Sequence, residues 1–297
     1  MQSKNRSKIV SISIPFSTIK NVMAFYEDGA CPLPSIYHLF FSKINDLTIA
    51  IYQPKKGICK VVFQGEKSKE ESLLWQPQTP RISHAGSDEV GTGDFFGPLV
   101  VVASYVSSSH IEQLQTLGVK DSKELDDTMM KRMKPALQSL LQFVTVVIHP
   151  EKYATFLEKG MNMNQIKASM HHVAINQLMK KYPYDAPTII DQFATDASMK
   201  RYFKNLTVLP KLQWEEKAES KHLAVAASSI LARVRFLEEM TQLNNTYQTH
   251  FPLGANPHVE TFALTFAKQH SLDTLKKVCK INFSTFKRIE QSLSELV

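Results

Sequence analysis

Residues 88–106 read DEVGTGDFFGPLVVVASYV, and this stretch decides the fold. Its latter part, Leu99–Val106, is a nearly continuous run of apolar and β-branched residues, which is typical of a strand covered on both faces. Two adjacent carboxylates, Asp88 and Glu89, end a shorter strand-like segment just before the Gly-Thr-Gly sequence at 91–93. The pattern predicts two strands joined by a glycine-rich connection that starts with acidic residues.

Strand-like and helix-like patterns alternate after this stretch. Gln142–Ile148 and Pro187–Asp191 repeat the apolar strand pattern. Apolar residues at helical spacing follow each of them, namely Ile166, Met170, Val173 and Leu178, then Leu223, Ala227, Ile230, Val234 and Leu237. Strands that alternate with helices predict an α/β fold, with a mixed or parallel sheet flanked by helices.

The length of 297 residues favours two domains. The best linker candidate is Gly65–Ser83, which is charged at first and then rich in Gln, Pro and Ser. Pro77 and Pro80 discourage regular structure near its end. We therefore expect a boundary near Pro80, which gives an N-terminal domain at 1–80 and a second domain at 81–297.

The N-terminal part is β-rich in pattern. The alternation IVSISI at Ile9–Ile14 suits a half-buried strand, and Asp46–Tyr52 and Gly57–Gln64 resemble two strands joined by a turn. Between these strands, Ser17–Tyr26 and Leu33–Phe41 have apolar residues at spacings that favour helices. The pattern predicts a small α+β domain.

The charge balance favours a polyanionic partner. The formal net charge is +7 and the isoelectric point is near 9.1. Met1–Pro80 holds ten basic and six acidic residues, so more than half of the excess lies in about a quarter of the chain. This asymmetry favours a module that faces nucleic acid, although a solvated lysine-rich surface would give the same count.

Cysteines and apolar runs exclude several classes of protein. Cys31, Cys59 and Cys279 lie far apart and form no CxxC pair, so the pattern predicts neither a zinc site nor a disulfide framework. Free thiols suit a reducing compartment. The apolar run Ile9–Ile14 is too short for a signal peptide or a membrane span. We expect a cytoplasmic protein.

Asp88 and Glu89 are the first candidates for chemistry. Adjacent strand residues point to opposite faces, so both can serve one site only if the backbone twists or Glu89 acts from the flank. The glycines at 91–93 let the backbone approach a ligand, but they could equally make a simple turn. They form no phosphate loop, because GxxxxGK[ST] is absent, and a strand-like run follows them instead of the helix of a dinucleotide fold.

Two further carboxylates stand at promising positions. Asp191 ends the run PTIID, and strand ends carry the sites of open α/β sheets, although a turn would also account for an Asp there. Glu219 precedes a helix rich in small residues. It could complement the helix dipole, or Ser220 could cap the helix. The run AVAAS at 224–228 is more often close helix–sheet packing than catalysis.

Taken in order, the motifs resemble one family. DEVGTGDFFGPLVVVA, GVKDSKEL at Gly118–Leu125, IDQF at Ile190–Phe193 and KAESKHLAVAASSILAR at 217–233 are similar to the type 2 ribonucleases H. Gly-Thr-Gly in place of Gly-Arg-Gly, with an extra N-terminal domain, resembles ribonuclease HIII. The resemblance covers about Arg81–Val297, and over Met1–Pro80 it rests on length and position alone.

The resemblance implies a ribonuclease H-like mixed sheet flanked by helices, preceded by a small TATA-binding-protein-like domain that grips the substrate. It implies an endonuclease that hydrolyses the RNA strand of RNA–DNA hybrids with two Mg²⁺ or Mn²⁺ ions and leaves 5′-phosphate and 3′-hydroxyl ends. The implied catalytic acids are Asp88, Glu89, Asp191 and Glu219, the first three as metal ligands. Asp196 competes with Asp191 for its place.

The resemblance also implies a substrate-contacting set. Backbone groups of Gly91, Thr92 and Gly93 would approach a minor groove lined by 2′-hydroxyls, and Lys123 and Lys221 would contact phosphates. Surface lysines with salt-bridge partners are the competing interpretation. For His258, in GANPHVET, a structural role competes with a place beside the substrate.

Two other functions stay open on the sequence. One is a junction cutter like ribonuclease HII, which acts at single ribonucleotides in DNA, and the short Thr92 side chain speaks against it. The other is a nucleic-acid-binding module without catalysis, which four acids beside a phosphate backbone disfavour. We expect a monomeric enzyme.

Overall fold

The computed structural model describes residues 8–75, 82–119, 125–204 and 211–295. The chain divides into two compact units, Met1–Pro80 and Arg81–Val297. In the described ranges, no helix combines the length and apolar character that a bilayer span needs.

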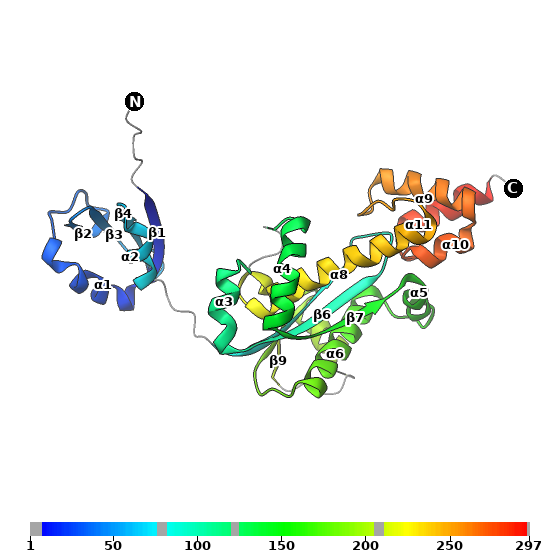
Figure 1. Ribbon diagram of the computed structural model, residues 1–297, viewed down its shortest axis with the longest axis horizontal. Coiled ribbons are helices and arrows are strands. Elements are labelled where there is room, and N and C mark those ends of the chain that lie inside the picture. Colours follow the sequence, from blue (N-terminus) through cyan, green and yellow to red (C-terminus); the bar gives the residue numbers. More distant parts are fainter. Residues whose placement is uncertain (1–7, 76–81, 120–124, 205–210, 296–297) are drawn as a thin grey trace, which may run out of the picture. The chain divides into compact units, whose positions relative to one another are not determined.

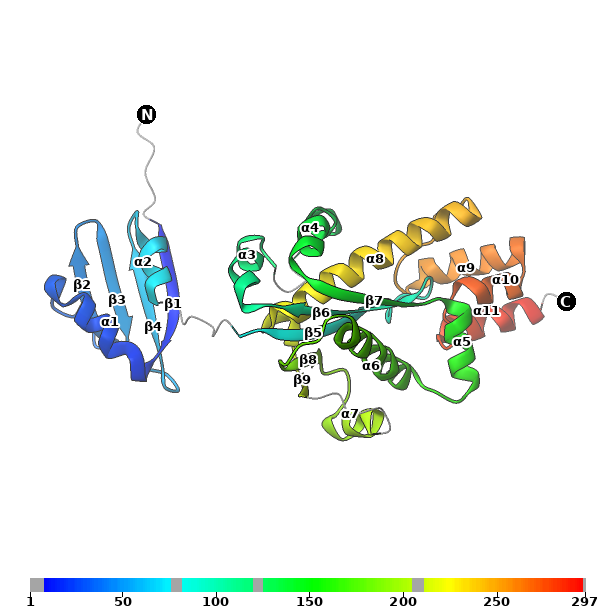
Figure 2. The ribbon, with the colours of Figure 1, turned by 60° about the horizontal axis from the view of Figure 1, so that its bottom comes forward.

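The N-terminal unit is a four-stranded antiparallel sheet with two α-helices on one face. The strands stand in the order β1 (Ile9–Pro15), β4 (Ile58–Gln64), β3 (Leu47–Tyr52) and β2 (His38–Ile44). Short 3₁₀ turns (Phe16–Thr18 and Glu27–Gly29) flank the first helix, and the helices are α1 (Ile19–Phe25) and α2 (Ser68–Trp75). Figure 2 shows both helices beside this sheet. Alternate strand residues such as Val61 and Phe63 are buried under the helices. The other face of the sheet carries no helix among the described residues.

Two predictions for this unit are wrong. The helix expected at Leu33–Phe41 is absent, because His38–Ile44 pairs with β3 and Phe41 lies opposite Ala50 in the ladder. The linker expected at Gly65–Ser83 is half helix. Its helix α2 is held because the Trp75 indole N–H donates to the Tyr26 hydroxyl at 2.9 Å. In both places tertiary contacts override the local pattern.

The second unit is built on a five-stranded mixed sheet. Its order is β7 (Gln142–Ile148), β6 (Leu99–Val106), β5 (His84–Val90), β8 (Thr188–Asp191) and β9 (Leu212–Glu215). Strand β6 runs antiparallel to its two neighbours, β5 and β7, whereas β8 and β9 run parallel to β5. The predicted mixed α/β sheet is therefore confirmed, with β5 at its centre.

Helices cover both faces of this sheet (Figure 1). On one face, Val100 and Val102 of β6 pack with the long helix α8 (Leu223–Tyr247) and with α4 (Asp127–Leu140). On the other face, Val101 packs with α6 (Met163–Lys181). This double coverage explains why the run at 99–106 is apolar without alternation.

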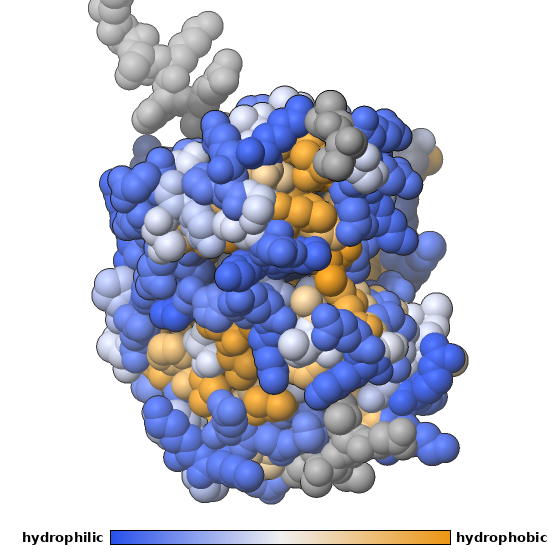
Figure 3. Space-filling view, turned by 90° about the vertical axis from the view of Figure 1, so that its right-hand side faces the viewer, coloured by the Kyte–Doolittle hydropathy of each residue, from blue (hydrophilic) through white to orange (hydrophobic). Residues whose placement is uncertain are grey.

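Smaller helices complete the second unit. They are α3 (Ile111–Thr116), α5 (Pro150–Glu158), α7 (Asp196–Phe203), α9 (Pro257–His270), α10 (Leu272–Val278) and α11 (Ser284–Ser294), with short 3₁₀ turns at Ser108–His110 and Ala218–Ser220. The face of the molecule that carries the C-terminal helices is largely hydrophilic, with hydrophobic patches between the polar side chains (Figure 3). All three cysteines are free, and Cys59 and Cys279 are buried.

Helix α8 lies unusually close to β5. A Cβ atom on Gly86 would stand 2.5 Å from the Val225 backbone nitrogen, a separation that no side chain tolerates. The Ser228 hydroxyl donates to the Gly86 carbonyl at 3.1 Å and so fixes how far the helix slides along the strand. The small residues at 224–228 therefore serve helix–sheet packing, as the sequence favoured.

Candidate active site

The ends of two parallel strands bring Asp88 and Asp191 together. In the ladder between β5 and β8, Ser87 pairs with Ile190, so the next residue of each strand is one of the two aspartates. Adjacent strands in a sheet lie about 4.8 Å apart. The Asp191 carboxylate accepts a hydrogen bond from the Ala218 backbone N–H at 2.8 Å. Asp191 is thereby tied to the 3₁₀ turn that contains Glu219.

Two other carboxylates, Glu89 and Glu219, lie near enough to Asp88 to affect its pKa. Burial first, and then the charge of Glu89, raises the pKa of Asp88 well above its usual range, and Glu219 contributes in the same direction. Hydrogen bonds from the Ser229 side chain and from the Glu89 backbone N–H lower this pKa but only partly offset the rise. Ser229 belongs to α8, so Asp88 faces the α8 side of the sheet.

Glu89 points to the opposite face, where helix α6 supplies two basic side chains. The Lys167 ammonium pairs with one carboxylate oxygen, and His171 Nε2 lies 2.8 Å from the other. Burial alone would raise the pKa of Glu89, but His171 and then Lys167 outweigh it and lower the pKa below its usual value. The alternation of the strand thus separates the two adjacent acids, as the sequence suggested.

His171 has a polar partner at each ring nitrogen. The Ser87 hydroxyl donates to the Val102 carbonyl at 2.9 Å and lies 2.8 Å from His171 Nδ1. The other ring nitrogen, Nε2, faces Glu89. His171 is fully buried and stacks on Phe193, with ring centroids 5.8 Å apart.

The donor atoms suit a hard divalent cation. Asp88, Asp191 and Glu219 offer only carboxylate oxygens, the ligands that Mg²⁺ and Mn²⁺ prefer, and the raised pKa of Asp88 marks negative charge that a cation would neutralise. Within the part of the chain that the structure describes, however, no three His, Cys, Asp or Glu side chains converge closely enough to hold a metal ion. Glu89 in particular is turned toward Lys167 and His171.

Comparison with known proteins identifies the family. The family model for ribonuclease HII matches residues 85–286. Ribonuclease HIII of Bacillus anthracis is 34% identical over 307 residues, which cover 94% of this chain and 96% of the relative, and that of Bacillus pumilus is 35% identical over 282 residues, which cover 86% and 90%. The chain belongs to the ribonuclease HIII family. The crystal structure of Bst-RNase HIII in complex with Mn²⁺ is similar, with a TM-score of 0.70, 32% identity, and coverage of 97% of this chain and 100% of that one.

Membership in the ribonuclease HIII family establishes the kind of reaction. Enzymes of this family cleave RNA in RNA–DNA hybrids with the help of metal ions, and the chain is an endoribonuclease of this kind. The resemblance of the motifs to the type 2 ribonucleases H is confirmed. The full-length coverage extends the likeness to the N-terminal unit, where the sequence offered only length and position.

The Gly-Thr-Gly segment forms the start of the loop between β5 and β6. Gly91 has a φ of +102°, and a Cβ there would stand 2.3 Å from the Pro98 carbonyl oxygen, so the two ends of the loop are in close contact. A Cβ on Gly93 would meet nothing within 4 Å. The loop of this ribonuclease HIII family member is therefore tight at its base and open at its tip.

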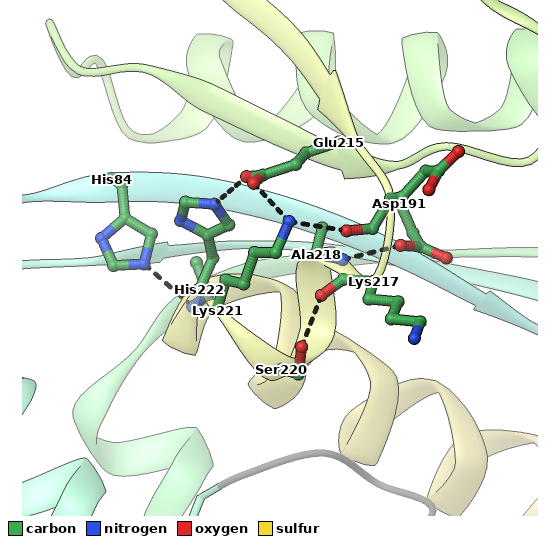
Figure 4. A network of polar contacts seen from close by, with 10 residues as sticks. His84, Asp191, Glu215, Lys217, Ala218, Ser220, Lys221 and His222 are labelled. Atoms are coloured by element: carbon green, nitrogen blue, oxygen red, sulfur yellow. Dashed lines mark hydrogen bonds and ion pairs between the residues drawn. The ribbon is translucent and has the colours of Figure 1, made fainter. Parts of the chain in front are cut away.

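The predicted substrate lysines are placed only in part. Lys123 lies outside the described residues. The Lys221 ammonium pairs with Glu215 at 2.5 Å and donates to the Glu216 carbonyl at 2.9 Å (Figure 4). His258 is exposed in the first turn of α9.

The side chains of Asp196 and Ser220 bind other partners than those the sequence suggested. Asp196 starts α7, where it accepts from the Trp214 indole N–H at 2.9 Å and pairs with Lys200 at 2.7 Å. The Ser220 hydroxyl donates to the Lys217 carbonyl, so the suggestion that Ser220 caps α8 is wrong (Figure 4). The residue at the cap position is His222, whose side chain makes no capping hydrogen bond.

Sequence reasoning missed Lys167, His171 and Ser229. Two basic residues four apart on a helix share one face, and Ile166 and Met170, which neighbour them, belong to the buried stripe. The four-residue spacing of Lys167 and His171 beside buried residues could have indicated that both side chains face the interior of the protein. Ser229 directly follows the small-residue run at 224–228 of α8, and nothing in the sequence distinguished it from a packing residue.

His84 supplies a pH-dependent contact near the site. Its Nδ1–H donates to the Ile82 carbonyl at 2.9 Å, and its Nε2 accepts the Ala224 N–H of the first turn of α8 at 3.2 Å (Figure 4). Burial lowers the pKa of His84, the Ile82 contact raises it, and the charge of His222 lowers it, with a net fall below 6.5. Only the neutral ring can accept from α8.

We expect His84 to contribute less to the stability of the fold as the pH is lowered. The unfolded chain binds a proton at this side chain near pH 6.5, whereas the folded chain resists it, so stability is present above about pH 6.5 and is lost as the pH falls toward the lower folded-state pKa. Urea unfolding of wild type and His84→Gln at about pH 7.5 and about pH 5.5 measures this. The stability of wild type relative to the variant should fall at the lower pH. Equal losses in both proteins would contradict the assignment.

Proposed function

We propose that this chain hydrolyses the RNA strand of RNA–DNA hybrids through two bound Mg²⁺ or Mn²⁺ ions, as a cytoplasmic monomer, and leaves 5′-phosphate and 3′-hydroxyl ends. The observation that carries the proposal is the register of β5 and β8, which sets Asp88 beside Asp191, with Glu219 tied to the same strand ends through Ala218. Asp88 and Asp191 would hold the metal, Glu89 would join them by turning away from Lys167 and His171, and Glu219 would be the fourth acid. Two cations there would stabilise the attacking and leaving oxygens of the phosphodiester.

The residues around these acids orient them. The Ala218 N–H donates to Asp191, and the Ser229 hydroxyl donates to Asp88, so each aspartate keeps other lone pairs for a cation. Lys167 and His171 neutralise Glu89 in the absence of metal. The site therefore tolerates a dense group of carboxylates before a cation binds.

The structure supports Asp191 over Asp196 as the metal ligand, and a pair of variants tests this. Substituting a residue that only hydrogen-bonds to a metal ligand typically costs about 10–100-fold in activity or affinity, so substituting a direct ligand should cost more. Asp191→Asn should lower kcat on a hybrid more than about a hundredfold, with hybrid affinity retained or raised because a repulsive charge is gone. The matched control, Asp196→Asn, should keep activity within about threefold of wild type. Retained cleavage by Asp191→Asn, with loss in Asp196→Asn, would reverse the assignment.

We also propose that the backbone at Gly91, Thr92 and Gly93 reads the RNA strand. RNA is distinguished from DNA by 2′-hydroxyls in a shallow minor groove, and a backbone without side chains approaches such a groove closely. Gly93 has open space around it and does not need a positive φ, so its lack of a side chain is not required by the fold itself. Substrate approach is the remaining physical reason for glycine there.

Gly93→Ala separates folding from binding. Because the added methyl meets nothing in the free protein, the melting temperature should stay within about 2 °C of wild type. If the substrate approaches this point, KM for a hybrid should rise at least about tenfold. Steady-state kinetics and thermal unfolding together measure both quantities. An unchanged KM would mean that the tip of the loop lies away from the substrate.

Lys221 is proposed as a phosphate contact. Its ammonium is 45% exposed and its partner Glu215 is 42% exposed, so a phosphate can compete for it in a solvent-screened ion pair of small net strength. Lys123 keeps the same proposed role from its sequence motif alone.

The N-terminal unit is proposed to bind the hybrid through the open face of its sheet. This open face comprises the strand residues that point away from α1 and α2, which are Ile9, Ser11, Ser13, Pro15, Phe41, Lys43, Thr48, Ala50, Tyr52, Ile58, Lys60, Val62 and Gln64. Four of its members, Ser11, Ser13, Thr48 and Ala50, carry small side chains, which let a duplex lie close to the strands there. Lys43 and Lys60 are exposed and supply positive charge for phosphates.

Neutralising the two lysines of the open face should reduce the salt dependence of binding. Each phosphate contact contributes roughly 0.7–0.9 to the slope of log affinity against log salt, so the double variant Lys43→Gln, Lys60→Gln should lower that slope by roughly 1.4–1.8. Lys20→Gln, Lys69→Gln is the matched control, because these exposed lysines lie on the two helices. Equal slopes for the two double variants would exclude the open face as the binding surface.

A further inference from the structure

The loop between β5 and β6 closes over a buried lysine from the C-terminal region. Lys280 follows α10 and is 1% exposed. Its ammonium donates to the carbonyl oxygens of Asp94 at 2.8 Å, Gly97 at 2.8 Å and Phe96 at 3.3 Å. Three carbonyls of one short segment therefore converge on one side chain that comes from more than 180 residues farther along the chain.

The backbone beside Lys280 fastens the same segment. The Lys280 N–H donates to the Phe95 carbonyl at 2.8 Å, and the Gly97 N–H donates to the Val278 carbonyl at 3.0 Å. Phe96 also forms an isolated antiparallel bridge with Cys279. The segment 94–97 is thus attached along its whole length to 278–280.

A second connection holds the start of this segment. The Asp94 carboxylate accepts from the Gly254 N–H at 2.7 Å, and the Phe95 N–H donates to the Gly254 carbonyl at 2.9 Å. Asp94 directly follows Gly93 at the open tip of the loop. The position of the Gly-Thr-Gly segment is therefore set by contacts made immediately after it.

Burying the charged ammonium of Lys280 costs desolvation free energy, which its hydrogen bonds must offset. Burial lowers the pKa of Lys280 to about 7, although the nearby Asp94 carboxylate raises it. The three carbonyls use all three N–H donors of the ammonium, and without it these acceptors, two of them fully buried, would lose that donor. A purely apolar side chain would fill the same volume but would leave these carbonyls without it, so the lysine fixes the shape of the loop rather than only filling space.

We propose that Lys280 is a positioning residue for substrate recognition, which holds the loop so that the backbone at 91–93 faces the RNA strand. The inference rests on the proposed contact of this backbone with the substrate. It assigns a role in the reaction to the C-terminal region, which holds none of the acids. Asp88 and Glu89 lie within the β5–β6 ladder and do not depend on this fastening.

The test is Lys280→Met, which keeps the length of the side chain and removes its donors. We expect KM for a hybrid to rise about tenfold, while kcat at saturating hybrid and the affinity for Mn²⁺, titrated without substrate, stay within about threefold of wild type. The control is Arg288→Gln, which breaks the ion pair of α11 with Glu260 in the same C-terminal region without touching the loop. It should lower stability and leave KM unchanged.

Two outcomes would overturn the proposal. One is a lower melting temperature in Lys280→Met with unchanged KM, which is the result of a merely structural lysine. The other is a parallel loss of kcat and Mn²⁺ affinity, which would mean that the acids are disturbed. Gly93→Ala tests the substrate contact of the backbone at 91–93 separately from the role of Lys280. If Gly93→Ala raises KM and Lys280→Met does not, the substrate contact stands and only the positioning role of Lys280 is refuted.

A folding failure of Lys280→Met would still leave a decisive measurement. Lys280→Gln retains two N–H donors on a shorter side chain and should give an intermediate KM. In the wild-type protein, the amide hydrogens of Phe95, Gly97 and Lys280 should exchange as slowly as those of β6, since all three donate within the fastened segment. Rapid exchange at these amides would show a loose loop and refute the proposal.

Discussion

The close contact of α8 with β5 at Gly86 is the constraint on which the catalytic half of the molecule depends. Because Gly86 has no side chain, the first turns of α8 reach the backbone of the central strand. Ser228 then sets the register of the helix against the strand. This places Ser229 at Asp88 and brings the turn with Glu219, which precedes α8, to the ends of β5 and β8. A packing requirement thus positions the acids that are proposed to be catalytic.

The site is organised as two layers of charge on either side of the central strand. On the α8 side, Asp88 lies near Glu219 and has a raised pKa because burial and like charges favour its neutral form. On the α6 side, Glu89 pairs with Lys167 and contacts His171. Strand alternation causes this division, since neighbouring residues leave the strand in opposite directions. A divalent cation at the strand ends would compensate the side that lacks basic partners.

The errors of sequence reasoning in the N-terminal unit have one physical cause. The run from Leu33 to Phe41 and the charged segment at Gly65–Ser83 were assigned from local pattern, whereas each is decided by distant partners. Pairing with β3 makes a strand of the first. Contact of Trp75 with Tyr26 makes a helix of part of the second. In the second unit the patterns at 99–106 and 142–148 were long and strongly apolar, and both strands were predicted correctly.

The sequence by itself determined the family and the mixed sheet, and it supplied the proposed set of acidic residues, because these follow from ordered motifs and from the apolar strand pattern. Only the tertiary structure decided how the acids are shared between the two faces, that Lys167 and His171 neutralise Glu89, and that Lys280 holds the loop. These contacts join residues from about 80 to more than 180 positions apart, and periodicity carries information only about neighbours. Which buried charge meets which partner is set by how helices and strands pack, and that is not local in the chain.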